Sequence, residues 1–392
     1  MITPSQAEAL IQQSELSLGE ENISLHLALN RVLAEDLLAD TDLPPFNRVM
    51  MDGIALNYRA IESGLRSFTI QAMQRAGEAP LTLTSDSHCI EIMTGGVCSI
   101  GCDTVVPYEH IRIENGIAHI EIIPNAVGKN IHLKGSDKKQ GNVLAEKGQR
   151  IGPAEIGIAA SIGKESLAVK RFPRVLVCST GDELVEIQQT PLAHQIRRSN
   201  VYALKAALQG IGIESSDLHL PDNAEELRTA LHSALRSFDV ILLSGGVSKG
   251  KFDLLPEVLH DLGVTSVFHG IAQRPGKPMW FGSSQKTVVF ALPGNPVSTL
   301  ACAARYVLPW LRTQLGLESM HSVIQIQDII TPHEKLTLFI PVRATQATSM
   351  MQTQVLRNQG SGDFSSLSGM TGFIEVEPGA HSTVEFRYFP LG

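Results

Sequence analysis

From about residue 172 onward, the chain alternates short apolar runs with amphipathic segments, and this alternation most restricts its fold. The apolar runs have the length of buried strands and cover Val175–Cys178, Val240–Leu243 and Val288–Leu292. Helices are predicted from Ser199 or Asn200 to Gln209, after Asn223, and from about Pro296 to Leu315. Strands that alternate with helices predict a doubly wound α/β domain, with a parallel sheet and helices on both faces. Ligands bind such sheets at the carboxyl ends of the strands.

The residues before this domain follow other patterns. Thr3 and Pro4 predict a helix start, because Thr caps helices and Pro suits the first helical position. A second helix is predicted near Leu25–Leu38. Strands and loops are predicted from about 41 to 141, where Asn115-Gly116 is a strong hairpin signal. A helix after Pro153 is consistent with a return of the chain to the N-terminal elements.

Beyond about residue 320, short strands predict a small β-barrel or sandwich. A length of 392 residues exceeds what one core usually supports, so two to four domains are expected. A formal charge of −8 argues against general nucleic-acid binding, whereas basic islands such as Arg197-Arg198 suit a small anionic ligand.

The N-terminus lacks a signal-peptide pattern and no apolar window has the length of a membrane span, which points to the cytoplasm. Five scattered cysteines, without the spacing of a zinc site, are interpreted as reduced core thiols.

Three turns of the α/β domain follow apolar runs and combine glycine with polar groups. They are Ser179–Glu183, Ser244–Ser248 and Leu292–Pro296. Glycine lets backbone N–H groups approach phosphate oxygens, and a helix N-terminus favours negative charge. Each turn alone is as compatible with a tight strand-to-helix connection as with an anion site, but their repetition at one sheet edge favours the site. Neither a P-loop nor a dinucleotide-binding motif occurs in the required context, which argues against kinases, GTPases and dehydrogenases.

Charged residues elsewhere extend this hypothesis. Arg274 and Lys277 flank a rigid Pro-Gly turn and are candidates for binding phosphate or an oxyanion. Asp253 is either a ligand-binding acid or the N-cap of the next helix. Asp52 lies in an apolar stretch and Asp137 lies next to cations. One or two carboxylates plus substrate phosphates typically hold Mg²⁺. A single Mg²⁺ site with acids from distant parts of the chain is therefore chemically reasonable.

In their order along the chain, seven segments resemble the molybdopterin molybdotransferase family of the bacterial MoeA type, which is similar to the E domain of gephyrin. They are Met51–Gly53, Ile92–Gly96, Ser179–Leu184, Ser199-Asn200, Ser244–Ser248, Pro275–Pro278 and Leu292–Pro296.

The resemblance implies a multidomain α/β fold with a MogA-like α/β domain, an inserted strand-rich domain, a linking α+β domain and a C-terminal β-barrel. The implied boundaries are 1–20 plus 173–320 for the α/β domain, 21–40 plus 142–172 for the linking domain, 41–141 for the insertion and 321–392 for the barrel. The resemblance also implies a homodimer.

The implied activity is insertion of molybdate into adenylylated molybdopterin, with Mg²⁺ as cofactor and AMP as a product. Molybdopterin adenylyltransferase and acceptor molybdoenzymes are the implied partners. The residues implied to be catalytic are Asp52, Asp137, Glu183, Asp222, Asp253 and Lys277, with Glu183 and Asp253 on the metal. The residues implied to bind the pterin nucleotide are Thr180, Gly181, Asp182, Asn200, Ser244, Gly245, Gly246, Val247, Ser248, Arg274, Pro275, Gly276, Pro278, Pro293, Gly294, Asn295 and Pro296.

The chain departs from the family's usual pattern at several positions. Ile54 replaces a Tyr, Ser136 replaces an acid and Arg274 replaces a Lys, while Lys249 and Lys251 stand where Val and an acid are common. A diverged paralogue that binds pterin or a partner protein without catalysis is therefore an alternative. Retention of the five acids argues against that alternative, and the missing dinucleotide motif argues against a nucleotide-dependent oxidoreductase.

Overall fold

The computed structural model describes residues 1–247, 254–318, 321–326, 328–347, 350–356, 360–380 and 385–391. The chain divides into two compact units. Unit one contains residues 1–22, 30–32 and 168–392, and unit two contains residues 23–29 and 33–167. This division is coarser than the four predicted domains, whose boundaries stay a prediction.

Unit one contains the predicted α/β sheet. Its strands, in spatial order, are β16 (Ser215–Leu220), β13 (Val175–Thr180), β17 (Val240–Ser244), β21 (Val288–Leu292), β20 (Trp280–Ser283) and β18 (Thr265–His269). The first four are parallel, which confirms the predicted parallel arrangement for them. The last two run antiparallel and form an edge that the sequence pattern did not predict.

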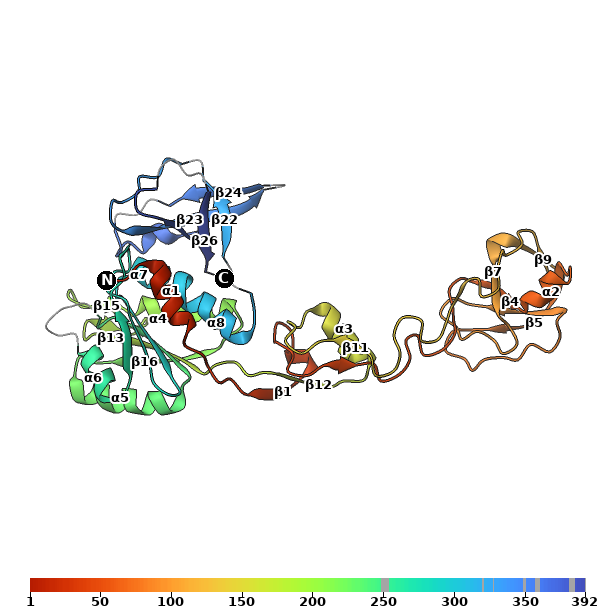
Figure 1. Cartoon of the computed structure of the whole chain (residues 1–392), viewed down its shortest axis with the longest axis horizontal. Helices are drawn as coiled ribbons and strands as arrows, with labels where there is room; N and C mark the ends of the chain where they lie inside the picture. Colours follow the sequence, from red (N-terminus) through yellow and green to blue (C-terminus); the bar gives the residue numbers. More distant parts are fainter. Residues whose placement is uncertain are drawn as a thin grey trace. The chain divides into compact units, whose positions relative to one another are not determined.

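Helices cover both faces of this sheet (Figure 1). Alternate residues of β13 face opposite cores, because successive side chains of a strand point to opposite faces. Val175 and Val177 belong to the core formed with α1 (Pro4–Gln12), α4 (Ser199–Gly210), α7 (Pro296–Cys302) and α8 (Leu308–Leu315). Leu176 and Cys178 belong to the core formed with α5 (Ala224–Ser237) and α6 (Leu255–Asp261). The doubly wound architecture is thereby confirmed.

Local hydrogen bonds fix the ends of these helices. The Thr3 hydroxyl accepts from Gln6 N and the Gln6 side chain accepts from Thr3 N, so the predicted capping box is present. The Asn223 side chain accepts from the backbone N–H groups of Glu225 and Glu226 and caps α5. The segment predicted as one helix from Pro296 contains a π-helical turn, η3 (Ala303–Val307), between α7 and α8.

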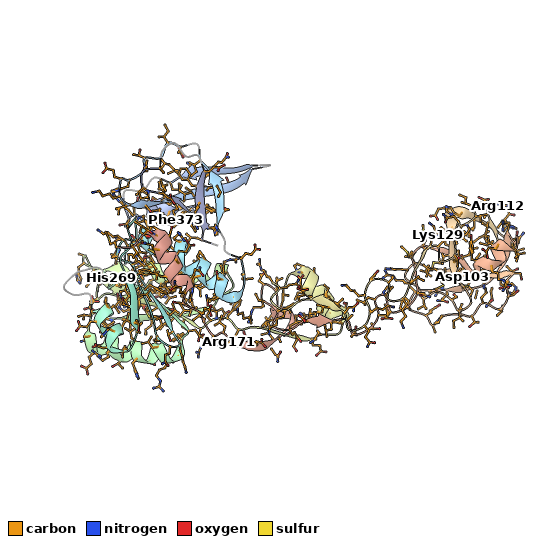
Figure 2. All side chains as sticks on the ribbon, viewed as in Figure 1. Asp103, Arg112, Lys129, Arg171, His269 and Phe373 are labelled. Carbon is orange, nitrogen blue, oxygen red and sulfur yellow. The ribbon has the colours of Figure 1, made fainter. Side chains whose placement is uncertain are left out.

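The C-terminal strands form a second sheet in unit one. Its order is β19 (Gln273–Arg274), β23 (Thr337–Ala347), β25 (Gly372–Val376), β26 (Glu385–Pro390) and β22 (Ser322–Gln325), and β24 (Met350–Val355) also pairs with β23. A short 3-10 helix, η4 (Ser365–Leu367), precedes β25. Phe373, labelled in Figure 2, is fully buried in this part of the chain. The described strands form an open order with two ends, so barrel closure stays a prediction.

Unit two contains a mixed sheet of the predicted strand-rich segment. Its order is β7 (Thr104–Pro107), β4 (Gly53–Leu56), β6 (His88–Ile92), β5 (Ser67–Gln74), β9 (Ile117–Ile120) and β8 (Ile111–Glu114). The helices α2 (Tyr58–Glu62) and η2 (Tyr108–His110) connect its strands. Asn115 and Gly116 have φ angles of 49° and 76°, and β8 pairs with β9, so the predicted hairpin is confirmed.

Short ladders complete the chain. They are β3 (Arg48–Val49) with β10 (Ile131–His132), β2 (Leu37–Leu38) with β11 (Val143–Ala145), β1 (Glu20–Ser24) with β12 (Ser166–Lys170), and β14 (Leu184–Val185) with β15 (Ile196–Arg197). The predicted helix after Pro153 is α3 (Pro153–Ser161).

The helix predicted near Leu25–Leu38 is wrong. A 3-10 turn, η1 (Leu25–Leu27), is followed by irregular backbone and then by β2. Leu27 and Leu29 are 70% and 51% exposed, so these apolar residues do not form the buried stripe of a helix within this chain. Asn30 adopts a positive φ of 67°, which a right-handed helix cannot include. Leu33 N instead donates to Gln149 O in a distant segment.

Candidate functional site

A cavity of about 670 Å³ lies at the carboxyl ends of β13, β17 and β21, and we call it the sheet-edge cavity. All three predicted glycine-containing turns contribute to it, as expected for strands whose carboxyl ends share one edge. The predicted residues that line it are Thr180, Gly181, Glu183, Asn200, Asp222, Ser244, Gly245, Gly246, Val247, Pro278, Pro293, Gly294, Asn295 and Pro296. The structure thus brings together acids and glycines that lie over 100 residues apart in the chain.

The Thr180 hydroxyl lies against the glycine turn that follows β17. Gly245 has a φ of 104°, and a Cβ there would lie 2.7 Å from Thr180 Oγ1. Glycine is therefore required by both backbone conformation and space. Thr180 Oγ1 is buried and has no hydrogen-bond partner among the described residues. A buried hydroxyl without a partner is costly, and Thr180 lines the sheet-edge cavity, where its predicted contact with a ligand stays a prediction.

Asn200 braces the turns of the cavity. Its Nδ2 donates to Ser244 Oγ at 2.9 Å and to Gly294 O at 2.7 Å, and lies 3.2 Å from Thr299 Oγ1. These bonds tie the start of α4 to the turns after β17 and β21. Asn200 therefore holds two walls of the cavity together, and its predicted contact with a ligand stays a prediction.

Two carboxylates enter the cavity from different turns. Glu183 follows β13, and Asp222 lies just before the capping residue of α5. Asp182 is absent from the lining of this cavity, and its Oδ1 accepts from Asp222 N at 3.1 Å. Asp182 thus positions the turn that carries Asp222, while its predicted binding role is untested.

Arg197 also lines the sheet-edge cavity. Its Nε lies 3.0 Å from Ile187 O and 3.2 Å from Gln189 O. The neighbouring Arg198 is only 5% exposed and forms ion pairs with Glu186 and Asp217. The sequence marked this pair as a basic island without assigning it to the site. Strand β15 carries Arg197 to the cavity, and that placement depends on its pairing with β14.

A second cavity of about 1,020 Å³ contains Arg274 and Lys277, and we call it the basic cavity. The predicted segment Arg274–Pro278 contributes one wall, and it shares Pro278, Pro293 and Asn295 with the sheet-edge cavity. The C-terminal sheet and its loops contribute a largely apolar wall that includes Leu338, Ile340, Pro341 and Leu356. Its chemistry suits an anion that approaches the two cations.

Buried hydrogen bonds fix the turn that carries Lys277. Gln273 is fully buried, its Nε2 donates to Pro275 O at 3.0 Å, and Tyr306 Oη donates to Gln273 Oε1 at 2.5 Å. Ser298 and Ser361 line the same cavity, and Asn295 Nδ2 donates to Ser361 Oγ at 2.9 Å. The sequence did not mark either serine as a site residue, although the Gly/Ser composition around Ser361 was a visible signal.

Two predicted acids lie in unit two. Asp52 Oδ1 accepts from Thr94 N at 2.6 Å and from Thr94 Oγ1 at 2.7 Å. The backbone N–H and then the hydroxyl of Thr94 lower the pKa of Asp52, since both bonds favour the charged form. The Asp137 carboxylate lies 2.7 Å from His132 Nε2. Their convergence with Glu183 and Asp222 stays a prediction.

Ser248 and Asp253 lie outside the described residues, as do Lys249 and Lys251. Within the described ranges, no group of three or more His, Cys, Asp or Glu side chains could hold a metal ion. The predicted metal pair of Glu183 and Asp253 therefore stays a prediction.

The cysteines fit the prediction of unreactive thiols. All five are free. Burial raises the pKa of Cys89, Cys178 and Cys302 to about 12, and that of Cys98 to about 11. Thiols with such pKa values are protonated at neutral pH and are poor nucleophiles.

Comparisons with known proteins match most of the chain. Residues 2–163 match the MoeA N-terminal region (domain I and II), and residues 176–313 match the probable molybdopterin binding domain. A molybdopterin molybdenumtransferase of Synechocystis sp. is 39% identical over 100% of this chain and 99% of its own length. The chain belongs to the molybdopterin molybdenumtransferase family. A second member, from Haemophilus influenzae, is 33% identical over 81% of this chain and 78% of its own length.

The solved structures agree with this family. The crystal structure of the molybdopterin biosynthesis MoeA protein from Pyrococcus horikoshii superposes with a TM-score of 0.84 and 28% identity, over 100% of this chain and 99% of that chain. The multidomain α/β architecture with a MogA-like domain is thus confirmed. Family membership does not favour the non-catalytic alternative. Across the described parts of the chain, no helix combines the length and apolar character needed to span a bilayer.

Proposed function

We propose that this protein inserts molybdate into adenylylated molybdopterin, releases AMP and forms molybdenum cofactor. The observation that carries the proposal is the sheet-edge cavity, in which Glu183, Asp222 and the Thr180–Gly245 contact converge beside the basic cavity of Arg274 and Lys277. Backbone N–H groups and the Thr180 hydroxyl would bind the pyrophosphate of the substrate. Arg274 and Lys277 would attract the molybdate oxyanion, because preorganised cations stabilise negative charge in a protected site.

The carboxylate chemistry of the sheet-edge cavity fits Mg²⁺, which prefers oxygen ligands and keeps contacts to substrate phosphates. Glu183 and Asp253 would be the two carboxylates that hold the ion. When bound, the ion would neutralise charge on the pyrophosphate. The guanidinium of Arg274 differs from the ammonium that the family usually has there, and it offers bidentate contacts to an oxyanion.

The protein would act as a homodimer in the cytoplasm. Asp52 and Asp137 of one protomer would complete a site on its partner. Molybdopterin adenylyltransferase would supply the substrate and acceptor molybdoenzymes would take the product. For the two substrates to react, adenylylated molybdopterin would occupy the sheet-edge cavity while molybdate occupies the basic cavity.

The test is turnover of adenylylated molybdopterin by the purified protein, with molybdate and with or without Mg²⁺. AMP release and cofactor formation are both measured. Asp52→Ala and Glu183→Ala are each expected to lower the rate by at least about 100-fold, because each removes charge from the reacting site, while circular dichroism stays unchanged. Asp86→Ala and Glu214→Ala, which remove exposed acids outside both cavities, serve as matched controls.

Mixing the two inactive variants tests the shared site. If sites span two subunits, a mixed dimer holds one intact site, and about a quarter of the wild-type rate is expected after subunit exchange. Wild-type turnover in either single variant would reject the proposed roles. An inactive mixture of properly exchanged subunits would reject the shared site.

A further inference from the structure

One short ladder of unit two leads to both of its predicted acids. Strand β3 pairs antiparallel with β10, and Arg48 lies directly opposite His132. Asp52 lies in the turn that follows β3, and Asp137 lies in the turn that follows β10. Because the strands are antiparallel, the chain leaves the ladder towards Asp52 and towards Asp137 in opposite directions, and the Arg48–His132 pair lies between these two segments. Neither Arg48 nor His132 was assigned a role by the sequence.

The side chains of this pair continue in a chain of contacts to Asp137. Arg48 Nη2 lies 3.1 Å from His132 Nδ1, and His132 Nε2 lies 2.7 Å from Asp137 Oδ1. The His132 side chain is 26% exposed and that of Asp137 is 55% exposed. The imidazole is thus more shielded than the carboxylate that it contacts, which leaves Asp137 open to a ligand.

The chemistry of arginine selects one tautomer of His132. A guanidinium has N–H donors and no acceptor, so its contact with Nδ1 requires that Nδ1 accept the hydrogen bond. The ring proton then resides on Nε2, which donates to Asp137. A doubly protonated ring would place two donors against each other at Nδ1. The contact with Arg48 therefore favours the tautomer in which Nε2 carries the proton and donates to Asp137.

We propose that His132 is a positioning residue for Asp137, and that Arg48 sets the tautomer that lets it do so. This inference rests on the proposed function, in which Asp137 acts in the shared site. Without His132, the described side-chain contact left to Asp137 is the Ser136 hydroxyl at 3.5 Å, which is too long to fix a carboxylate. The backbone ladder would persist, but the carboxylate would sample several rotamers.

Three substitutions of His132 separate positioning from folding. Gln places its amide nitrogen near the position of Nε2 and keeps a donor, whereas Asn is shorter and Ala has no donor. His132→Ala and His132→Asn are expected to lower kcat about 10-fold to 100-fold with little change in KM, because misplacement of a reacting group costs rates of this order. His132→Gln is expected to retain kcat within about threefold. The control is His119→Ala, which removes an imidazole that is hydrogen-bonded to Ser67 elsewhere in unit two and should leave kcat unchanged.

A spectroscopic measurement tests the tautomer independently of turnover. Protein labelled with ¹⁵N-histidine is expected to show His132 with Nε2 protonated and Nδ1 unprotonated at pH 7.5, and Arg48→Met is expected to produce a mixture of tautomers. A ring protonated on Nδ1 in the wild type would overturn the inference, as would wild-type kcat in folded His132→Ala. Absence of turnover by the wild type would overturn the proposed function and this inference with it. If the wild type is active and His132→Ala has the same kcat, this inference alone is overturned.

Discussion

Thr94 controls the ionisation of Asp52 through two hydrogen bonds, one from its backbone and one from its hydroxyl. Both favour the carboxylate over the neutral acid, so the pKa of Asp52 lies below its usual value. An acid with a lowered folded-state pKa contributes stability above its unfolded pKa, and this contribution is lost as pH falls through the folded pKa. A charge that is maintained over a wider pH range is consistent with the role proposed for Asp52.

We predict that Thr94→Val raises the pKa of Asp52, because the hydroxyl bond is lost while the backbone bond remains. In the titration of ¹³C-labelled aspartate carboxyl groups, the Asp52 signal should change at higher pH than in the wild type. The acidic limb of the rate profile should move in the same direction, with less than about a twofold change near neutral pH, where the carboxylate stays ionised. Thr94→Ser keeps the hydroxyl and should titrate like the wild type. An unchanged Asp52 titration in Thr94→Val would refute the assignment.

At the scale of elements, the cap of α5 connects local stability to the site. The Asn223 side chain accepts hydrogen bonds from two backbone N–H groups of the first helical turn. Asn223 directly follows Asp222, which lines the sheet-edge cavity. Such caps satisfy donors that have no partner within the helix. The same residue therefore ends the turn after β16 and begins the helix, so its loss affects both.

We predict that Asn223→Ala lowers the free energy of unfolding of the α/β domain by about 1 kcal/mol, the usual contribution of a helix cap. Urea unfolding followed by tryptophan fluorescence measures this directly, since the two tryptophans of the chain, Trp280 and Trp310, both lie in elements of that domain. Asn223→Asp retains an accepting oxygen and should lose far less stability. Equal stability of Asn223→Ala and the wild type would contradict the capping role.

At the scale of the whole molecule, a buried cation connects the first helix with the C-terminal sheet. Arg305, in the π-helical turn, has no exposed side-chain surface. It lies 2.8 Å from Glu8 of α1 and 3.4 Å from Glu375 of β25, while Arg387 lies within ion-pair distance of both acids. Burial raises the pKa of Glu375. The buried charges of Arg305 and Glu375 are therefore tolerable only with their partners.

We predict that Arg305→Ala destabilises the protein by about 3–5 kcal/mol, because it removes the fully buried partner of Glu375 and leaves that carboxylate only the partly exposed Arg387. Calorimetry of the full chain should show a large drop in Tm. Arg112→Ala removes one partner of an exposed pair with Glu114 and should cost less than about 1 kcal/mol. A similar Tm for both variants would show that the cluster contributes little.

The sequence alone determined those features that depend on neighbouring residues. Apolar runs identified β13, β17 and β21, Thr3 and Asn223 identified helix starts, and Asn115-Gly116 identified a hairpin. Periodicity and caps act over a few residues, so they can be recognised before the fold is known. The error near Leu25–Leu38 has the same origin, because apolar spacing was taken for a helix where contacts with distant segments such as Gln149 dominate.

Only the tertiary structure decided which side chains meet. It placed Glu183 and Asp222 in one cavity, joined β19 to the C-terminal sheet, and paired Arg48 with His132. It also showed that Asp182 and Asn200 brace the site. These contacts join residues that are far apart in the chain, and their formation depends on how sheets and helices pack. Local preferences determine the elements, whereas burial and hydrogen bonding between distant elements determine the site.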